Sequence, residues 1–288
     1  MGSLIFINLT TTGLTKCGAR LQNVVMKQKL SLISTVTVSL AMAIALGSSS
    51  AAALEPASVT HGLRGHSHLL NGTSTNWSGY AVETNLKTPL SGAVSDVSGS
   101  WVVPTVVCPI RSTNYSSAWV GIDGYSGNTV EQTGTEMDCQ RGRAQYYAWY
   151  EFYPQSEIAV STVAVHPGDV MKGDVTFAGT NTFVVTITDQ TTARSFSLSH
   201  RMNGTARQSA EWIAEAPSSW FGILPLANFG TMNFTNSTAT LNGHAGTIND
   251  PSWQNDPLTM VTSGGQPKDA LLPLSTDGTS FGVNWLHN

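Results

Sequence analysis

From Asn76 onward the sequence consists of short segments in which polar and apolar residues alternate, separated by Gly, Asn, Asp, Ser or Thr. The segments are rich in β-branched and aromatic residues, which with a period of two is typical of β-strands. The expected strands are NWSGYAV (76–82), VSGSWVVP (97–104), AQYYAWYEFYP (144–154), STVAVHPGD (161–169), NTFVVTITD (181–189), RSFSLSH (194–200), SAEWIAE (209–215) and TMNFTNST (231–238). With no evident linker and no repeat of fixed period, the sequence predicts one all-β domain, a sandwich or a barrel, over residues 76–288.

One expected hairpin carries a polar amide. In AWVGIDGYSGNTVEQTGTE, residues 118–136, two alternating segments flank a Gly-rich turn, which is a β-hairpin signature. Side chains alternate between the two faces of a strand, so Gln132 shares a face with Val130, while Glu131 and Thr133 point the other way.

Two further strands place carboxylates on defined faces. In SAEWIAE, Glu211, Ile213 and Glu215 share one face. We therefore expect Gln132 and Glu211 to meet across one sheet face. In the strand 144–154, Glu151 is flanked on its own face by Trp149 and Tyr153, which is typical of the wall of a binding cleft. The alternative is an exposed aromatic face with Glu151 in water.

The first fifty-odd residues differ from the rest. Lys27 and Lys29 precede an uncharged apolar run, 30–46, and the tract GSSSAAA follows it. This order predicts a secretory signal peptide over residues 1–53, with Met26 as an alternative start. A permanent membrane anchor is the alternative, but the run is shorter than the ~20 residues that a span needs. We expect a secreted, extracellular protein without a membrane partner after cleavage.

Residues 54–75 form a polar segment with few residues that could pack in a core, and they contain His61, His66 and His68. A histidine-rich segment could be a cationic pro-segment that covers an acidic cleft. Histidine gains charge as the pH falls below ~6.5, so the segment would respond to pH. A disordered linker is the alternative.

The net charge of the chain limits the classes of molecule that it could bind. Four of the fourteen Lys and Arg residues lie in the predicted leader and none of the eighteen Asp and Glu residues does, so the remaining chain has a formal charge of −8. Such a surface argues against nucleic acid or an anionic membrane as a partner. Charged residues make up 11% of the chain, against ~25% in ordinary domains. This composition suits a protein that works in acid, although a secreted protein rich in Ser, Thr and Gly would share it.

Cysteine use indicates one disulfide. Cys17 leaves with the predicted leader, so Cys108 and Cys139 remain as a pair in an oxidising compartment. A disulfide would close the loop that contains Gln132 and would stabilise the fold by ~3 to 4 kcal/mol on the chain-entropy model. Two free thiols are the alternative.

Common hydrolase signals are missing from the sequence. GYSGN does not complete a Gly-x-Ser-x-Gly elbow, and there is no His-Glu-x-x-His zinc motif and no Asp-Thr-Gly or Asp-Ser-Gly loop. The remaining histidines, His166, His200, His244 and His287, have no ligand spacing. We therefore expect no metal and no cofactor. Catalysis by carboxyl side chains is the class of chemistry that remains.

Six motifs occur in order between residues 76 and 240. They are Asn76-Trp77-Ser78-Gly79, Trp119-Val120-Gly121-Ile122-Asp123-Gly124, Gln132-Thr133-Gly134, Ala148-Trp149-Tyr150-Glu151-Phe152-Tyr153-Pro154, Ala210-Glu211-Trp212-Ile213 and Phe229-Gly230-Thr231. Together they resemble the serial motifs of the glutamic endopeptidases, or eqolisins. The chain departs from the fungal members in having a much shorter pro-segment.

The resemblance implies a concanavalin-like or jelly-roll-like sandwich of two long antiparallel sheets and acid-active, pepstatin-insensitive proteolysis of protein or peptide substrates. It implies that Gln132 and Glu211 are catalytic. Matching cleft positions are Trp119, Asp123, Trp149, Glu151 and Tyr153. Peptide hydrolysis without a metal needs a base for water and a donor for the oxyanion, which a Glu and a Gln can supply.

Two other classes fit parts of the pattern. A β-sandwich glycoside hydrolase would use paired carboxylates such as Glu151 and Glu211, with aromatic rings stacked on sugar. A lectin-like module would bind carbohydrate without cutting it. For a secreted digestive enzyme we expect a monomer.

Overall fold

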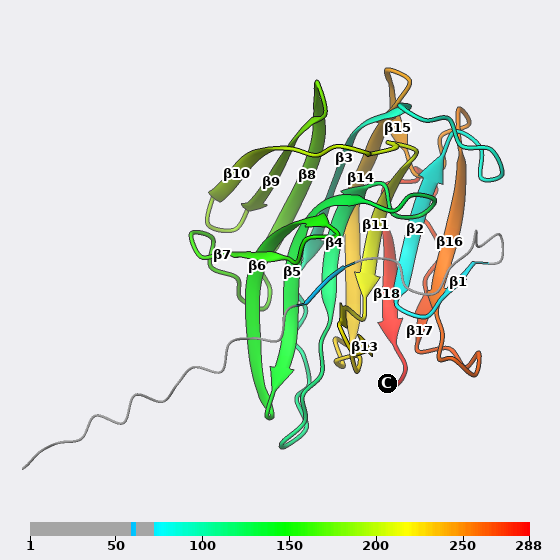
Figure 1. Ribbon diagram of the computed structural model, residues 1–288. Coiled ribbons are helices and arrows are strands. Elements are labelled where there is room, and N and C mark those ends of the chain that lie inside the picture. The colour runs from blue at the N-terminus through cyan, green and yellow to red at the C-terminus, as the bar shows by residue number, and fades with distance from the viewer. Residues whose placement is uncertain (1–58, 62–71) are drawn as a thin grey trace, which may run out of the picture. The chain divides into compact units, whose positions relative to one another are not determined.

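The computed structural model describes residues 59–61 and 72–288 of the chain. In this part of the protein there is no helix, and therefore no helix long and apolar enough to cross a membrane. Two large, mainly antiparallel sheets face each other (Figure 1), so the predicted all-β sandwich is confirmed. The predicted signal peptide, residues 1–53, lies outside the described residues.

The first sheet carries the candidate site. Its strands, in spatial order, are β1 (Thr73–Ser74), β16 (Gln254–Met260), β2 (Trp77–Glu83), β11 (Ser209–Glu215), β4 (Ser117–Ile122), β5 (Val130–Gln140), β6 (Arg143–Tyr153) and β7 (Ile158–Val160). Neighbouring strands are antiparallel except for the short parallel pair β1 and β16.

The second sheet packs against the first. Its strands, in spatial order, are β10 (Arg194–Arg201), β9 (Thr182–Asp189), β8 (Val170–Gly179), β3 (Val94–Val102), β14 (Thr231–Leu241), β18 (Phe281–Trp285) and β17 (Asp269–Leu271), with β15 (His244–Thr247) paired to β14. A small separate hairpin joins β12 (Ser218–Ser219) and β13 (Gly222–Ile223).

Two buried tryptophans tie the sheets together. The indole N–H of Trp212 on β11 donates to the carbonyl of Ser98 on β3 at 2.7 Å. In the other direction, the indole N–H of Trp101 on β3 donates to the hydroxyl of Thr135 on β5 at 2.8 Å. Buried donors need partners, so each ring supplies apolar area to the core and also sets the position of one sheet against the other.

Most expected strands occur where the sequence predicts them. The hairpin of β4 and β5 is confirmed, with Gly121 paired to Gln132, and β11 has the predicted bounds. The expected strand 161–169 is wrong, because β7 ends at Val160 and the chain continues as turns and irregular structure. Its alternation is nevertheless real, since Val163 and Val165 are buried and their neighbours are exposed. Alternation therefore indicates an extended chain that packs on the core, but it does not indicate whether that chain pairs with a neighbouring strand.

The predicted disulfide is confirmed. Cys108, in the loop before β4, is bonded to Cys139 near the end of β5. Asn114 and Cys139 also exchange backbone hydrogen bonds of 2.9 and 2.8 Å. The loop is therefore attached to the strand that carries Gln132 by both covalent and hydrogen bonds.

We predict that Trp212→Phe lowers the free energy of unfolding by about 1–3 kcal/mol, because the buried Ser98 carbonyl loses its donor. Trp285→Phe is the matched control, since the Trp285 indole N–H has no hydrogen-bond partner among the described residues. Urea unfolding of both variants measures the difference. Equal stability of the two variants would contradict the bridging role of Trp212.

Candidate active site

The two residues predicted to be catalytic lie in one row across the first sheet. Register places Glu211 of β11 opposite Gly121 of β4, and Gly121 opposite Gln132 of β5. Gln132 in turn lies opposite Glu151 of β6. Directly opposed residues share a face, so the three polar side chains project from the same side. That side is the one turned away from the second sheet, where a cluster including Trp119 and Trp149 is also buried.

Gly121 leaves space between the two polar side chains. A Cβ atom at this position would lie 3.0 Å from Cβ of Gln132, 3.1 Å from Cζ3 of Trp119 and 3.2 Å from Cγ1 of Val130. Any larger residue would occupy the gap between Glu211 and Gln132. The absence of a side chain at position 121 therefore allows Gln132, Trp119 and Val130 to pack closely against this strand.

The Gln132 amide is held by its nitrogen. Nε2 donates to Oε2 of Glu151 at 2.6 Å and to the main-chain carbonyl of His61 at 2.7 Å. The amide oxygen has no hydrogen-bond partner within the described ranges. Because both N–H groups are engaged, Glu151 and His61 determine the amide orientation, and the oxygen is free to accept a hydrogen bond from water.

Glu211 is fully buried and electrostatically crowded. Burial raises its pKa well above the ordinary value, the nearby Ser209 hydroxyl opposes the shift, and the charges of Asp123 and Glu83 add to it. A desolvated carboxyl group of this kind is a stronger base than an ordinary carboxylate once it is ionised, and it stays protonated to higher pH.

Asp123 holds the loop that leads into β11. Its carboxylate accepts the N–H groups of Ala206, Arg207 and Gln208 at 2.9, 2.6 and 2.8 Å. These residues precede Ser209, where β11 begins. Burial raises the pKa of Asp123, and the three N–H donors oppose that shift. Asp123 thus positions the strand that carries Glu211 and does not contact Gln132 itself.

The predicted aromatic residues line the same face. Trp119 donates its indole N–H to Oε2 of Glu215 at 2.7 Å. The Trp149 ring stacks on the His61 imidazole at 3.9 Å between centroids. Tyr153 is partly buried against the same cluster. The structure therefore brings together every site residue predicted from the sequence, with Asp123 acting from the loop side.

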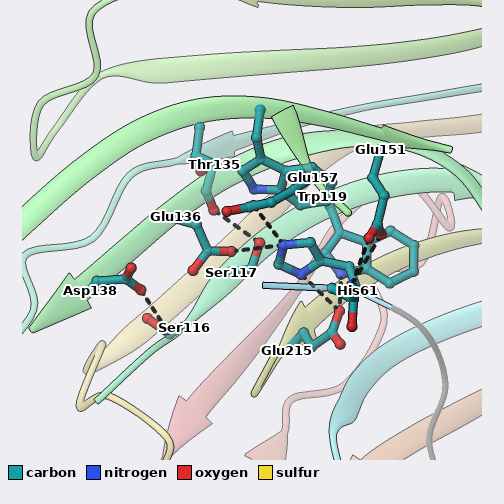
Figure 2. Close-up of polar contacts among 12 residues, drawn as sticks. His61, Ser116, Ser117, Trp119, Thr135, Glu136, Asp138, Glu151, Glu157 and Glu215 are labelled. Carbon is teal, nitrogen blue, oxygen red and sulfur yellow. Dashed lines mark hydrogen bonds and ion pairs between the residues drawn. The ribbon is translucent and has the colours of Figure 1, made fainter. Parts of the chain in front are cut away.

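An acidic group surrounds the imidazole of His61 (Figure 2). Nε2 lies 2.9 Å from Oε2 of Glu157 and 3.2 Å from Oε1 of Glu136, and Nδ1 lies 3.4 Å from Oε2 of Glu215. Burial alone would lower the His61 pKa, but hydrogen bonds to Glu157 and Glu215 and their charges outweigh it and raise it to about 10. The hydrogen bonds to Glu157 and Glu215 and their charges thus favour the protonated form of the imidazole.

Sequence reasoning did not single out these three carboxylates, although a signal existed for two of them. Glu136 shares the face of Gln132 on β5, four residues along, and Glu215 shares the face of Glu211 on β11. Glu157 follows β6 in a loop, where no periodicity applies.

His61, Glu136 and Glu157 also offer ligand atoms within 4.8 Å of one another, a spacing that could suit a metal ion. The distances from Nε2 of His61 are those of a hydrogen bond and an ion pair. In this structure His61 contacts Glu157 and Glu136 through a hydrogen bond and an ion pair.

The fold and this face together define a β-sandwich hydrolase with an amide and a carboxylate on either side of a glycine. The sequence matches the Peptidase A4 family over residues 75–268, and the chain belongs to this family, the glutamic peptidases or eqolisins. The family is one of peptidases, which favours proteolysis over the glycosidase and lectin alternatives.

Individual relatives agree with this membership. The chain is 30% identical over 203 residues to aspergillopepsin-2 of Aspergillus niger, covering 60% of this chain and 69% of that protein. It is 31% identical over 150 residues to scytalidopepsin B of Scytalidium lignicola, covering 48% and 56%. A crystal structure of scytalido-glutamic peptidase with a transition state analog inhibitor is similar with a TM-score of 0.61 and 25% identity, covering 74% of this chain and 98% of that one.

We predict that Gly121→Ala lowers kcat for peptide hydrolysis by about 100-fold, because the added methyl group displaces Gln132 from its productive position. Gly264→Ala is the control, since a Cβ there meets only the Thr262 hydroxyl at 3.7 Å. Steady-state kinetics on a peptide substrate provide the measurement. A Gly121→Ala enzyme as fast as the control would show that the gap is not needed.

We also predict that the folded state loses stability as the pH rises. Burial raises the pKa of Glu131 from 4.5 to about 9, with a further contribution from the charge of Asp123. A carboxyl group with a raised folded pKa contributes its full stability below the unfolded pKa and loses it as the pH rises toward the folded value. The melting temperature should therefore fall between about pH 5 and about pH 9.

Melting temperatures of Glu131→Gln over the same pH range test whether ionisation of Glu131 causes the fall. The substituted amide cannot ionise, so the fall should be smaller than in the wild type. Asp174→Asn changes a half-buried carboxylate beside Lys172. It should leave the change of melting temperature with pH as it is in the wild type. A wild-type melting temperature that rises over this range would contradict the assignment.

Proposed function

We propose that the protein is a secreted, acid-active endopeptidase that hydrolyses peptide bonds with Glu211 as general base and Gln132 as oxyanion donor. The observation that carries the proposal is the row in which Glu211 and Gln132 flank Gly121 on one face of the first sheet. Membership of a peptidase family supports the peptide as the substrate class. The basic, apolar, small-residue order of residues 1–53 supports secretion.

In this mechanism ionised Glu211 removes a proton from a water molecule located over Gly121. The resulting hydroxide attacks the carbonyl carbon of the scissile bond, and Nε2 of Gln132 donates to the developing oxyanion. Glu211 then returns the proton to the nitrogen of the leaving amine. Because Gln132 does not titrate, its contribution is the same throughout the acid range.

The carboxyl groups around the site favour activity in acid. Burial raises the pKa of Glu151 to about 8 and raises the pKa values of Glu136 and Glu215 in the same direction. These shifts favour the neutral forms of the three groups as the pH falls, which reduces their mutual repulsion. As the pH rises, several negative charges would have to coexist in one buried cleft, which is costly.

Glu211 itself must ionise for the reaction. Burial raises its pKa, and the charges of Asp123 and Glu83 add to the shift. Water that enters with the substrate solvates the carboxylate and lowers the pKa toward the ordinary value. The base therefore becomes available in acid when the site is filled with substrate and water.

Digestion of a denatured protein between about pH 2 and about pH 7 tests the proposal. Wild-type protein should cut in acid, with pepstatin or a metal chelator present, and Glu211→Gln should lose at least about 99% of the activity. Glu131→Gln is the matched control, because Glu131 neighbours Gln132 on β5 but lies on the opposite sheet face. A folded, processed wild type that cuts no protein at any of these pH values would overturn the proposal.

A further inference from the structure

A pocket of about 420 Å³ lies outside the catalytic row. Parts of the chain that are distant in sequence meet there, including the segment after β13, the loop between β16 and β17, and the residues after β18, near the end marked C in Figure 1. None of the described residues that line it belongs to the candidate active site. They are Thr75, Ile223, Leu224, Pro225, Val261, Thr262, Ser263, Lys268 and Asn288. A pocket of this volume can hold a small organic molecule.

The lysine of this pocket is fixed by its main chain. The N–H of Lys268 donates to the carbonyl of Met260, at the end of β16, at 2.7 Å. The Lys268 carbonyl accepts the N–H groups of Leu286 and His287 at 3.0 and 3.2 Å. These bonds hold Lys268 between two segments that are far apart in sequence, so its place in the pocket is set by the fold.

The Lys268 side chain is buried without a counter-charge. It is 6% exposed, and its ammonium group makes no hydrogen bond or ion pair within the described part of the chain. Burial lowers its pKa, and the charge of Asp269 opposes the shift. Asp269 is engaged elsewhere, since its Oδ1 accepts the hydroxyl of Ser78 at 3.0 Å and the N–H of Met260 at 3.1 Å. An unpaired buried charge is costly, and an anion in the pocket would reduce that cost.

The other lining residues indicate what kind of anion would fit. Hydroxyl groups that can donate to an oxygen come from Thr75, Thr262 and Ser263. Aliphatic side chains come from Ile223, Leu224 and Val261. Among the described lining residues there is no second cation, no acid and no aromatic ring. A single lysine matches a singly charged group, and the aliphatic side chains match an aliphatic body.

We propose that this pocket is a binding site for a small aliphatic carboxylate, held by an ion pair with the ammonium group of Lys268. Two sources share this chemistry: a short fatty acid, and the free carboxyl terminus of a peptide that ends in an aliphatic residue. The proposal does not depend on the proposed function, because Glu211 and Gln132 take no part in it.

Calorimetric titration of the full-length protein at about pH 6, where a carboxylic acid is ionised, measures the binding of hexanoate and of its neutral analogue hexanamide. Hexanoate should bind at least about tenfold more tightly, because only the carboxylate can pair with Lys268. Lys268→Met should reduce this difference to less than about twofold. Lys87→Met, at an exposed lysine outside the pocket, should bind hexanoate as the wild type does. Equal affinities of the wild type for hexanoate and hexanamide would overturn the proposal.

Two further measurements separate lost binding from lost folding. Lys268→Met should melt at or above the wild-type temperature without ligand, because an apolar side chain replaces an unpaired buried charge. A crystal structure of the wild type with hexanoate needs no variant. It should place a carboxylate oxygen within about 3 Å of Nζ of Lys268, and hexanoate bound only elsewhere would overturn the proposal.

Titration with N-acetyl-leucine separates the two sources of the carboxylate. Binding as tight as that of hexanoate, or tighter, would identify the carboxyl terminus of a peptide as the ligand, and weaker binding would identify a fatty acid. Digestion of denatured protein should be equally fast with Lys268→Met and with the wild type. Loss of carboxylate binding with unchanged digestion would therefore leave the peptidase proposal intact, and the two proposals can fail separately.

Discussion

The antiparallel register through Gly121 is the constraint on which the site depends. Strands β11, β4 and β5 pair so that Glu211, Gly121 and Gln132 fall in one row. A shift of one residue in either pairing would send one of the polar side chains to the opposite face, into the core between the sheets. Core packing, the indole bridges and the disulfide all hold this register. The stability of the sandwich and the geometry of the site therefore have the same physical origin.

A second theme is the burial of acids in a chain with few charges. Burial raises the pKa values of Glu83, Glu131 and Glu151 to about 7, 9 and 8. Such groups favour the folded state while they are protonated and oppose it when they ionise. The proposed acid activity and the predicted loss of stability at higher pH therefore rest on the same property, the burial of carboxyl groups. His61 comes from outside the two sheets, and its ring nitrogens contact three carboxyl groups of the site face.

Much of the fold and of the candidate site could be predicted from the alternation of polar and apolar residues along the sequence. Alternation with a period of two identified the strands and the faces of Gln132 and Glu211, because the pleat imposes that period wherever one face is buried. It failed at residues 161–169, where alternation reflects packing without pairing. Resemblance to known motifs supplied the partnership of strands that are distant in sequence. For His61 the sequence predicted only that it belongs to a cationic segment. Its position could not be predicted, because the carboxyl groups around it come from three separate parts of the chain.

The central claim is that Glu211 and Gln132 act as one unit on a single water molecule and a single carbonyl group. A double-mutant cycle on kcat/KM for one peptide substrate tests it most directly, using Glu211→Ala, Gln132→Ala and the variant with both changes. Each single change should lower kcat/KM by at least about 100-fold, and the second change should add little to the first. Losses that simply add, or a single variant that keeps acid activity, would contradict the claim.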